Sequence, residues 1–365
     1  YTKGSQTMKA ALLQMVSTTD VATNLDTAER LLAQAAQAGA ELAVLPEYFC
    51  LLGPRDSDEL DIAETFGDGP MQNRLSRMAA QHAVWLVAGS LPIAVPGDSS
   101  RVRNTCLVFN PSGECVARYD KIHLFDVDLP DGNTYRESAT VQPGNQLPPV
   151  VEVPGLCRVG LSICYDVRFP ELYRHLAASG ADLLMIPAAF TAFTVKDHWQ
   201  VLLQARAIEN TAYVVAPAQT GQHYGRRQSH GHALVIDPWG TVLADAGVSV
   251  SAAIAPIDPG HALRVRAQMP SLKHRRSALL AQQAQNTGHG DARGAQGIGN
   301  VLVGEAQVEQ QALLAGLAVI LSEQLEKTAH PLLDAAQHRQ HLGRGLGGKL
   351  FAGSSRHGHL HHDSS

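Results

Sequence analysis

The chain has 365 residues, of which 45% are hydrophobic and 17% are charged, and its formal net charge is −5. This composition can fill a substantial core, and it excludes both a wholly disordered chain and a small disulfide-rich scaffold. The mild acidity and the shortness of the longest apolar run, 312–321, predict no nucleic-acid and no membrane partner. The five cysteines are odd in number and lack CxxC spacing, so a reducing, cytoplasmic location is expected.

Strand and helix signals alternate along the first 276 residues. Strands are predicted over 9–15, 41–45, 85–90, 105–110, 115–119, 158–163, 182–186, 212–217, 232–236 and 242–246. One helix is predicted to begin after Asn24 as its N-cap and to end before Gly39, a second begins at Pro170, and a third covers 196–210. Many strands with helices between them predict an α/β layered fold.

The composition changes near residue 277. Of the 19 aromatic residues, 18 precede residue 278, whereas the last 88 residues hold eight of the 17 histidines. We therefore expect an N-terminal extension over 1–8, a folded domain over 9–276, and a tail over 277–365 that is disordered or loosely helical. The histidine run at 357–362 is interpreted as part of an incidental tail rather than as a metal site.

Three chemically active residues follow the ends of predicted strands: Glu47, Lys121 and Cys164. Loops at such positions are where α/β proteins place functional groups. Each residue alone is more often a solvated charge or a small buried hydrophobe. Together they supply a base, an ammonium that stabilises a thiolate or an oxyanion, and a nucleophile. An alternative base for the thiol is a histidine, His123, His175 or His198.

Longer motifs surround these three residues. They read Leu-Pro-Glu-Tyr around Glu47, Arg-Tyr-Asp-Lys-Ile-His-Leu-Phe-Asp around Lys121, and Gly-Leu-Ser-Ile-Cys-Tyr-Asp-Val-Arg-Phe-Pro-Glu-Leu around Cys164. In these motifs, from about Lys9 to Arg276, the chain resembles the nitrilase superfamily of carbon–nitrogen hydrolases. The resemblance implies a four-layer αββα sandwich, a homodimer or higher homo-oligomer, and a Glu-Lys-Cys triad that uses no metal and no organic cofactor.

The resemblance also implies a role for each residue. Glu47 would accept the thiol proton while Cys164 attacks an amide carbon. Lys121 and the backbone N–H of Tyr165 would hold the resulting oxyanion. Glu137, in the motif Tyr-Arg-Glu-Ser, matches the second glutamate of the family, which helps to orient the lysine and the attacking water.

Within the superfamily the motifs are most similar to the Nit-type branch. Arg168 lies four residues after the cysteine and matches the arginine with which that branch binds a carboxylate. Phe190 and Thr194 align with pocket residues of the branch. The alternative for Arg168 is a salt bridge to Asp166 or Glu171.

The Arg-Phe-Pro-Glu-Leu motif and the segment 219–232 look more like the deaminated-glutathione amidases than the ω-amidases. The implied reaction hydrolyses a small-molecule amide, deaminated glutathione, to 2-oxoglutarate and cysteinylglycine. Arg226 and Arg227 would hold the peptide carboxylate, or they lie in a solvated loop. Two alternatives stay open: an ω-amidase acting on 2-oxoglutaramate or 2-oxosuccinamate, and a non-catalytic binding or scaffold member of the same fold.

Overall fold

The computed structural model describes residues 7–55, 57–130, 132–154, 157–192, 195–225, 227–276 and 279. The chain divides into two compact units, Tyr1–Glu305 and Ala306–Ser365, and every described residue belongs to the first unit. The predictions of a disordered tail and of an incidental histidine run thus lie almost wholly outside the described residues. Each helix in the described part of the chain is too short or too polar to cross a lipid bilayer.

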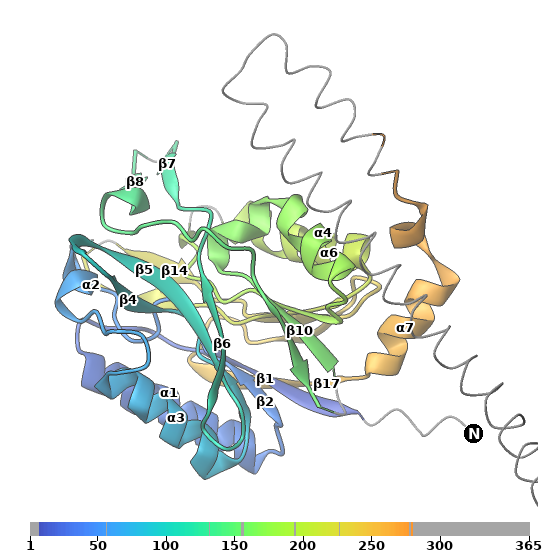
Figure 1. Ribbon diagram of the computed structural model, residues 1–365, viewed down its shortest axis with the longest axis horizontal. Coiled ribbons are helices and arrows are strands. Elements are labelled where there is room, and N and C mark those ends of the chain that lie inside the picture. The colour runs from blue at the N-terminus through green and yellow to red at the C-terminus, as the bar shows by residue number, and fades with distance from the viewer. Residues whose placement is uncertain are drawn as a thin grey trace, which may run out of the picture. The chain divides into compact units, whose positions relative to one another are not determined.

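Two mixed β-sheets form the centre of the first unit (Figure 1). The first has the order β17-β1-β2-β3-β5-β4, with β6 paired to β5. Its strands are β1 (Met8–Gln14), β2 (Leu42–Val44), β3 (Trp85–Val87), β4 (Leu91–Val95), β5 (Asp98–Phe109), β6 (Cys115–Asp120) and β17 (Ser251–Ile257).

The second sheet has the order β16-β15-β12-β11-β10-β9. Its strands are β9 (Val150–Val153), β10 (Cys157–Leu161), β11 (Leu183–Met185), β12 (Tyr213–Ala216), β15 (Leu234–Ile236) and β16 (Val242–Asp245). Three neighbouring strands run parallel in each sheet, β1-β2-β3 in the first and β10-β11-β12 in the second. The carboxyl ends of the parallel strands therefore meet at one edge of each sheet.

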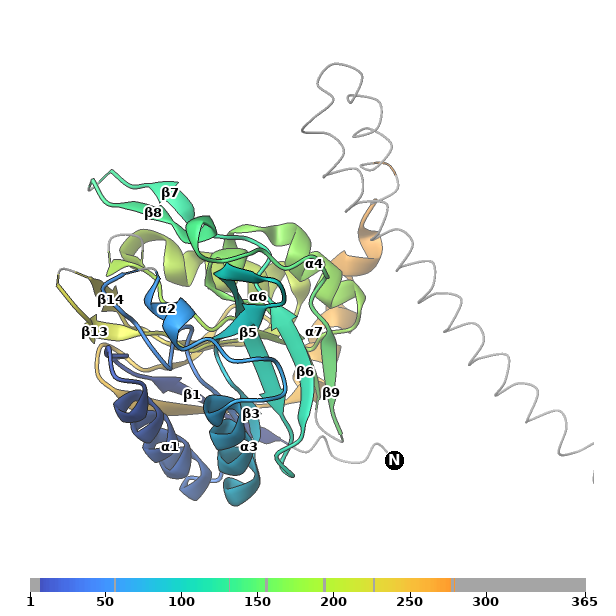
Figure 2. The same ribbon diagram turned by 60° about the vertical axis from the view of Figure 1, so that its left-hand side comes forward.

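Helices cover the outer faces of the two sheets (Figures 1 and 2). The helices α1 (Val21–Gln37) and α3 (Pro70–His82) lie on the first sheet, and α4 (Pro170–Ala178) and α6 (Gln200–Asn210) lie on the second. One apolar cluster fills the space between the sheets and continues under α4 and α6, and another lies between the first sheet and α1 and α3. The predicted αββα sandwich is confirmed.

Smaller elements decorate this sandwich. Two of them are the helices α2 (Asp58–Asp61) and α7 (Pro259–Gln268). Four are helical turns: η1 (Glu137–Ala139), η2 (Cys164–Arg168), η3 (Val195–Trp199) and η4 (Ser271–His274). The remaining strands form two hairpins, β7 (Asp126–Asp128) with β8 (Thr134–Arg136) and β13 (Thr220–Gln222) with β14 (Gln228–His230). Figure 2 shows the hairpin β7-β8 projecting from the body of the unit.

The first helix begins earlier than predicted. Its N-cap is Asp20, whose side chain accepts a hydrogen bond of 2.7 Å from the Thr23 N–H. Asn24 instead lies inside the first turn and donates to the carbonyl of Cys50, 2.9 Å away, so the prediction of Asn24 as N-cap is wrong. The end of the helix is as predicted, because Gly39 follows the last turn with a φ of 85°, which favours glycine.

Candidate active site

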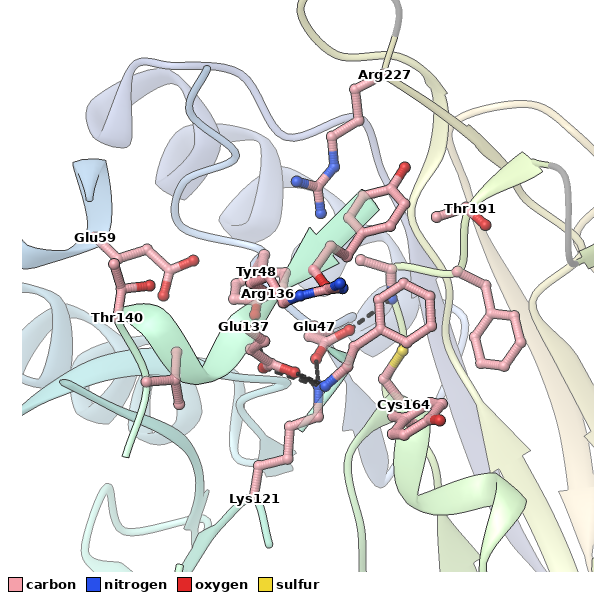
Figure 3. A pocket seen from close by; sticks show the side chains of 16 residues that line it. Glu47, Tyr48, Glu59, Lys121, Arg136, Glu137, Thr140, Cys164, Thr191 and Arg227 are labelled. Carbon is pink, nitrogen blue, oxygen red and sulfur yellow. Dashed lines mark hydrogen bonds and ion pairs between the residues drawn. The ribbon is translucent and has the colours of Figure 1, made fainter. Parts of the chain in front are cut away.

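A pocket opens where β2, β6 and β10 end. Seven of the ten residues predicted for the site line it: Glu47, Lys121, Glu137, Cys164, Tyr165, Phe190 and Arg227. Figure 3 shows that their side chains come from elements far apart in the sequence. Of the other three, Thr194 and Arg226 lie outside the described residues, and Arg168 lies behind the pocket wall.

Lys121 lies between two carboxylates, as the dashed lines of Figure 3 show. Its Nζ is 2.9 Å from Glu47 Oε1 and 2.9 Å from each carboxylate oxygen of Glu137. The three side chains are almost fully buried. Burial alone would lower the pKa of Lys121, but the carboxylates of Glu137 and Glu47 outweigh burial and raise this pKa well above its ordinary value. Lys121 is therefore an ammonium at physiological pH.

Glu47 has a fixed orientation because three groups donate hydrogen bonds to it. Its Oε1 accepts from Lys121 and, at 3.1 Å, from the side-chain amide of Asn104. Its Oε2 accepts from the backbone N–H of Ala189 at 2.9 Å. Oε1 is thus directed toward Lys121, and Oε2 is directed toward the side of the pocket on which Cys164 lies (Figure 3).

Glu137 is a second carboxylate held from several sides. It accepts hydrogen bonds from Lys121, from the Tyr48 hydroxyl at 2.9 Å, from the Asn104 amide at 3.1 Å and from the Phe125 backbone N–H at 2.6 Å. Burial would raise the pKa of Glu137, but the Lys121 charge and these donors together lower it. Glu137 is therefore ionised, and its charge holds the Lys121 ammonium in place.

Cys164 lies at a sharp turn between β10 and the helical turn η2. Its φ is 45°, in the left-handed region that non-glycine residues rarely adopt, and its N–H donates to the Pro187 carbonyl at 2.8 Å. Burial raises the pKa of the thiol, the negative charge of Glu47 raises it further, and Lys121 opposes both effects without cancelling them. The resting thiol is therefore protonated and needs a base to become a nucleophile.

A family model described as carbon-nitrogen hydrolase matches residues 9–267. The chain belongs to this family. A deaminated glutathione amidase from Synechocystis sp. is 54% identical over 266 residues, which are 73% of this chain and 97% of that protein. These matches confirm the family resemblance, and they show that the protein is a hydrolase acting on carbon–nitrogen bonds other than peptide bonds.

Solved structures agree with this assignment. The NitFhit protein of Caenorhabditis elegans, a fusion of a nitrilase and a fragile histidine triad protein, is 40% identical with a TM-score of 0.70, covering 75% of this chain and 66% of that chain. A mutant amidase from Nesterenkonia sp. AN1 is 28% identical with a TM-score of 0.64, covering 76% of this chain and 97% of that chain. In that structure the acetamide moiety of fluoroacetamide is added covalently to the active-site cysteine.

In this carbon–nitrogen hydrolase Arg168 packs against the pocket from outside. Its guanidinium lies over the rings of Tyr165 and Phe190, with its Cζ 5.8 and 5.5 Å from their centroids, and its Nη1 is 3.3 Å from His198 Nδ1. It forms no ion pair with Asp166 or Glu171 in the described structure, so the predicted alternative of a salt bridge is wrong. The guanidinium instead stabilises two aromatic residues of the pocket wall.

The alternative of a histidine base finds no support in the geometry. His123 donates a hydrogen bond of 2.7 Å from Nδ1 to the carboxylate oxygen Oδ1 of Asp166, and its ring stacks on Phe169 at 3.7 Å. His198 contacts Arg168, and no histidine is among the described residues that line the pocket. In this carbon–nitrogen hydrolase, Glu47 is instead a carboxylate that lines the same pocket as Cys164.

Sequence reasoning missed several residues of the site: Tyr48, Glu59, Asn104, Tyr135 and Arg136. Tyr48 directly follows Glu47 in the motif Leu-Pro-Glu-Tyr, and this adjacency was the signal that could have identified Tyr48 as a site residue. Asn104 lies inside β5, just before the strand that the sequence predicts over 105–110, so its burial gave no signal in the sequence. Glu59 belongs to the acidic segment Asp58–Asp61, which has the composition of an exposed helix and gives no signal of a pocket residue.

Substitution of Tyr48 tests how much its hydrogen bond to Glu137 contributes to the stability of the fold. We expect Tyr48→Phe to lower the free energy of unfolding by about 1.5–3 kcal/mol, because a buried carboxylate loses one of its donors. Urea denaturation of the variant and of the wild type at pH 7 measures the difference. Tyr224→Phe, on a hydroxyl that contacts Arg227 at 3.3 Å rather than the buried cluster, is the matched control and should change stability less.

Proposed function

We propose that the pocket is the active site of a deaminated glutathione amidase with Cys164 as nucleophile and Glu47 as general base. The observation that carries this proposal is the arrangement of one buried ammonium, Lys121, between two carboxylates in the pocket that Cys164 also lines. Two findings support it further: the Synechocystis relative of that name is 54% identical, and the active-site cysteine of the related amidase carries a covalent acetamide.

The first half of the proposed reaction forms a thioester. Glu47 takes the proton of the Cys164 thiol while the sulfur attacks the amide carbon, and the carbonyl electron pair moves to oxygen. The Lys121 ammonium and the N–H of Tyr165 stabilise the oxyanion. Because Tyr165 is in the first turn of η2, its N–H has no intrahelical acceptor. When the oxyanion collapses, the C–N bond breaks and protonated Glu47 gives its proton to the leaving amine.

The second half releases the acid. Glu47, again a carboxylate, takes a proton from water while the water oxygen attacks the thioester carbon. Collapse of this second oxyanion breaks the C–S bond, and the thiolate of Cys164 regains the proton from Glu47. Glu137 touches neither reacting bond; it is a positioning residue that keeps Lys121 charged and in place.

The pocket also supplies a binding site for an anionic substrate. Of its two arginines, Arg136 pairs with Asp128 at 2.7 Å, whereas Arg227 has no carboxylate within 4 Å among the described residues. A guanidinium binds a planar carboxylate through two parallel hydrogen bonds. We propose that Arg227 holds the glycine carboxylate of the leaving dipeptide, with Thr194 and Arg226 as further substrate contacts and Arg168 supporting the wall.

A comparison of two substrates separates this proposal from its alternatives. We expect kcat/KM for deaminated glutathione to exceed that for 2-oxoglutaramate by about tenfold or more, because only the first has a leaving group whose carboxylate can contact Arg227. Steady-state kinetics at pH 7 measures both values.

Arg227→Leu is the diagnostic variant for this comparison. It should lower kcat/KM for deaminated glutathione while leaving that for 2-oxoglutaramate, whose leaving group is ammonia, nearly unchanged. The reverse preference in the wild type would establish an ω-amidase, and the absence of turnover of both amides would establish a non-catalytic member of the fold.

A further inference from the structure

Glu59 lines the pocket but takes no part in the cluster around Lys121. It is on the short helix α2, and Figure 3 shows its carboxyl group directed into the pocket from the side opposite Cys164. Its Oε2 is buried and has no hydrogen-bond partner among the described residues. Buried carboxyl oxygens are nearly always paired, because an unpaired one loses the hydrogen bonds it made to water. This oxygen is therefore available to a ligand.

Arg227 is the complementary group in the same pocket. It comes from the loop between β13 and β14, and Figure 3 shows its guanidinium also directed inward. The Arg227 guanidinium donates to the hydroxyl of Tyr224 and lies over the ring of the same residue, and no carboxylate is within 4 Å of it in the described structure. Arg227 and Glu59 thus face one space without forming an ion pair, which leaves room for a ligand between them.

Burial and the charges nearby together set the protonation state of Glu59. Burial raises the pKa of Glu59 to about 8, the charge of Glu137 and then that of Glu47 contribute in the same direction, and Arg227 and Lys121 oppose them without prevailing. At pH 7 the Glu59 side chain is therefore mainly an uncharged carboxylic acid, which donates a hydrogen bond through its O–H.

Two titratable side chains near α2 have pKa values shifted away from the range between pH 7 and 9. Burial raises the pKa of Tyr48 well above its ordinary value, and burial likewise raises that of the Cys50 thiol. On β5, which α2 contacts, Arg101 pairs with Asp98 at 2.9 Å and Arg103 donates to the Pro143 carbonyl. Among the described groups of this region with a shifted pKa, Glu59 is the one whose pKa lies between 7 and 9.

We propose that Glu59 is a specificity residue whose uncharged carboxyl group donates a hydrogen bond to a substrate carboxylate held by Arg227. The inference deepens the proposed function, since it requires an anionic substrate in this pocket. A neutral Glu59 leaves the positive charge of Arg227 uncompensated and adds a donor beside it. An ionised Glu59 would remove the donor, offset the charge of Arg227 and repel the substrate carboxylate.

The pH dependence of kcat/KM tests this role. For deaminated glutathione we expect the wild-type value to fall by about tenfold or more from pH 7 to 9.5, following ionisation of a group with a pKa of about 8. Glu59→Gln keeps an N–H donor but cannot ionise, so its value should stay near that of the wild type at pH 7 and should not fall. Glu59→Leu should already be about tenfold lower at pH 7, because it has no donor.

The matched control is Asp61→Asn, which removes a carboxylate from the same helix at a side chain that is 74% exposed. This variant should keep the wild-type pH profile. If kcat/KM of Glu59→Gln declines above pH 8 as it does in the wild type, or if Glu59→Leu keeps full activity at pH 7, the proposed role of Glu59 is rejected.

A binding measurement separates failure of this inference from failure of the proposed function. Calorimetric titration of the Cys164→Ala variant with N-acetylalanylglycine, a thiol-free analogue of the leaving dipeptide, probes the carboxylate assigned to Arg227 and needs no turnover. The affinity should fall by about tenfold from pH 7 to 9.5, and this fall should vanish in Cys164→Ala/Glu59→Gln. If binding behaves in this way but the wild type does not hydrolyse deaminated glutathione, the proposed substrate is rejected and the proposed role of Glu59 in binding a carboxylate is kept. Binding of N-acetylalanylglycine that is undetectable at pH 7, or equally pH-dependent in both variants, would reject the site.

Discussion

Cys164→Ala should lower amide hydrolysis by about 10⁴-fold or more and leave the fold unchanged. The substitution removes the sulfur that forms the acyl–enzyme bond, and no other described residue of the pocket supplies a thiol. Alanine also has the smaller side chain, so it fits the space that the thiol occupies. Turnover of deaminated glutathione and the midpoint of urea unfolding, measured on the same preparation, test both parts of the prediction.

Two controls sharpen this prediction. Cys115→Ala alters an exposed cysteine far from the pocket lining and should retain wild-type turnover. A thiol-directed electrophile should label Cys164 in the wild type, and this labelling should disappear in Cys164→Ala. Substantial residual hydrolysis by Cys164→Ala would contradict the thioester mechanism, whereas loss of cooperative unfolding would show that the cysteine is needed for folding.

The second large effect is expected for Lys121→Met, which removes the cation between two buried carboxylates. At pH 7 the variant should lose about 3–5 kcal/mol of unfolding free energy, because Glu47 and Glu137 are left buried without their partner. Hydrolysis should fall by about 10³-fold, since the oxyanion loses its charged donor. Urea denaturation and steady-state kinetics measure the two losses. Lys273→Met, at an exposed lysine, is the matched control.

The stability loss in Lys121→Met should depend on pH. In the wild type the folded-state pKa of Lys121 is raised, so its contribution is fully present below about pH 10 and is lost only as the pH rises through that higher value. The folded-state pKa of Glu137 is lowered, so its contribution is lost as the pH falls through that value. The difference between wild type and variant should therefore stay constant from pH 7 to about 4.5 and shrink as the pH falls from about 4.5 toward 3. A difference that stays constant below about pH 4.5 would contradict the charge pairing.

The layered α/β class could be predicted from local patterns, but several elements could not. The strand β17 (Ser251–Ile257) consists mostly of small residues and forms because it pairs with β1 over seven positions. The helix α3 (Pro70–His82) has a polar majority, and a few side chains including Met71 and Leu75 attach it to the first sheet. In both cases a long-range contact, which local propensity does not describe, decides the structure.

The same distinction applies to the site. Glu47, Lys121 and Cys164 could be predicted because each follows a strand end, and the family motifs then identified them as a set. Asn104 and Glu59 could not, because their importance depends on neighbours that are distant in the sequence. Asn104 contacts Glu47, which is 57 positions away, and the pocket into which Glu59 points is assembled from both sheets.

The position of Lys121 between Glu47 and Glu137 has a consequence for the total charge of the site during the reaction. At rest the three side chains and the neutral thiol of Cys164 carry one net negative charge. During the proposed attack the proton passes from Cys164 to Glu47 and the new charge appears on the substrate oxygen, so the sum is again minus one. The net charge is also minus one in the thioester intermediate and during hydrolysis of the thioester. A buried cavity of low permittivity therefore completes both half-reactions with its total charge constant, and the energetic cost of charging such a cavity does not enter the barrier.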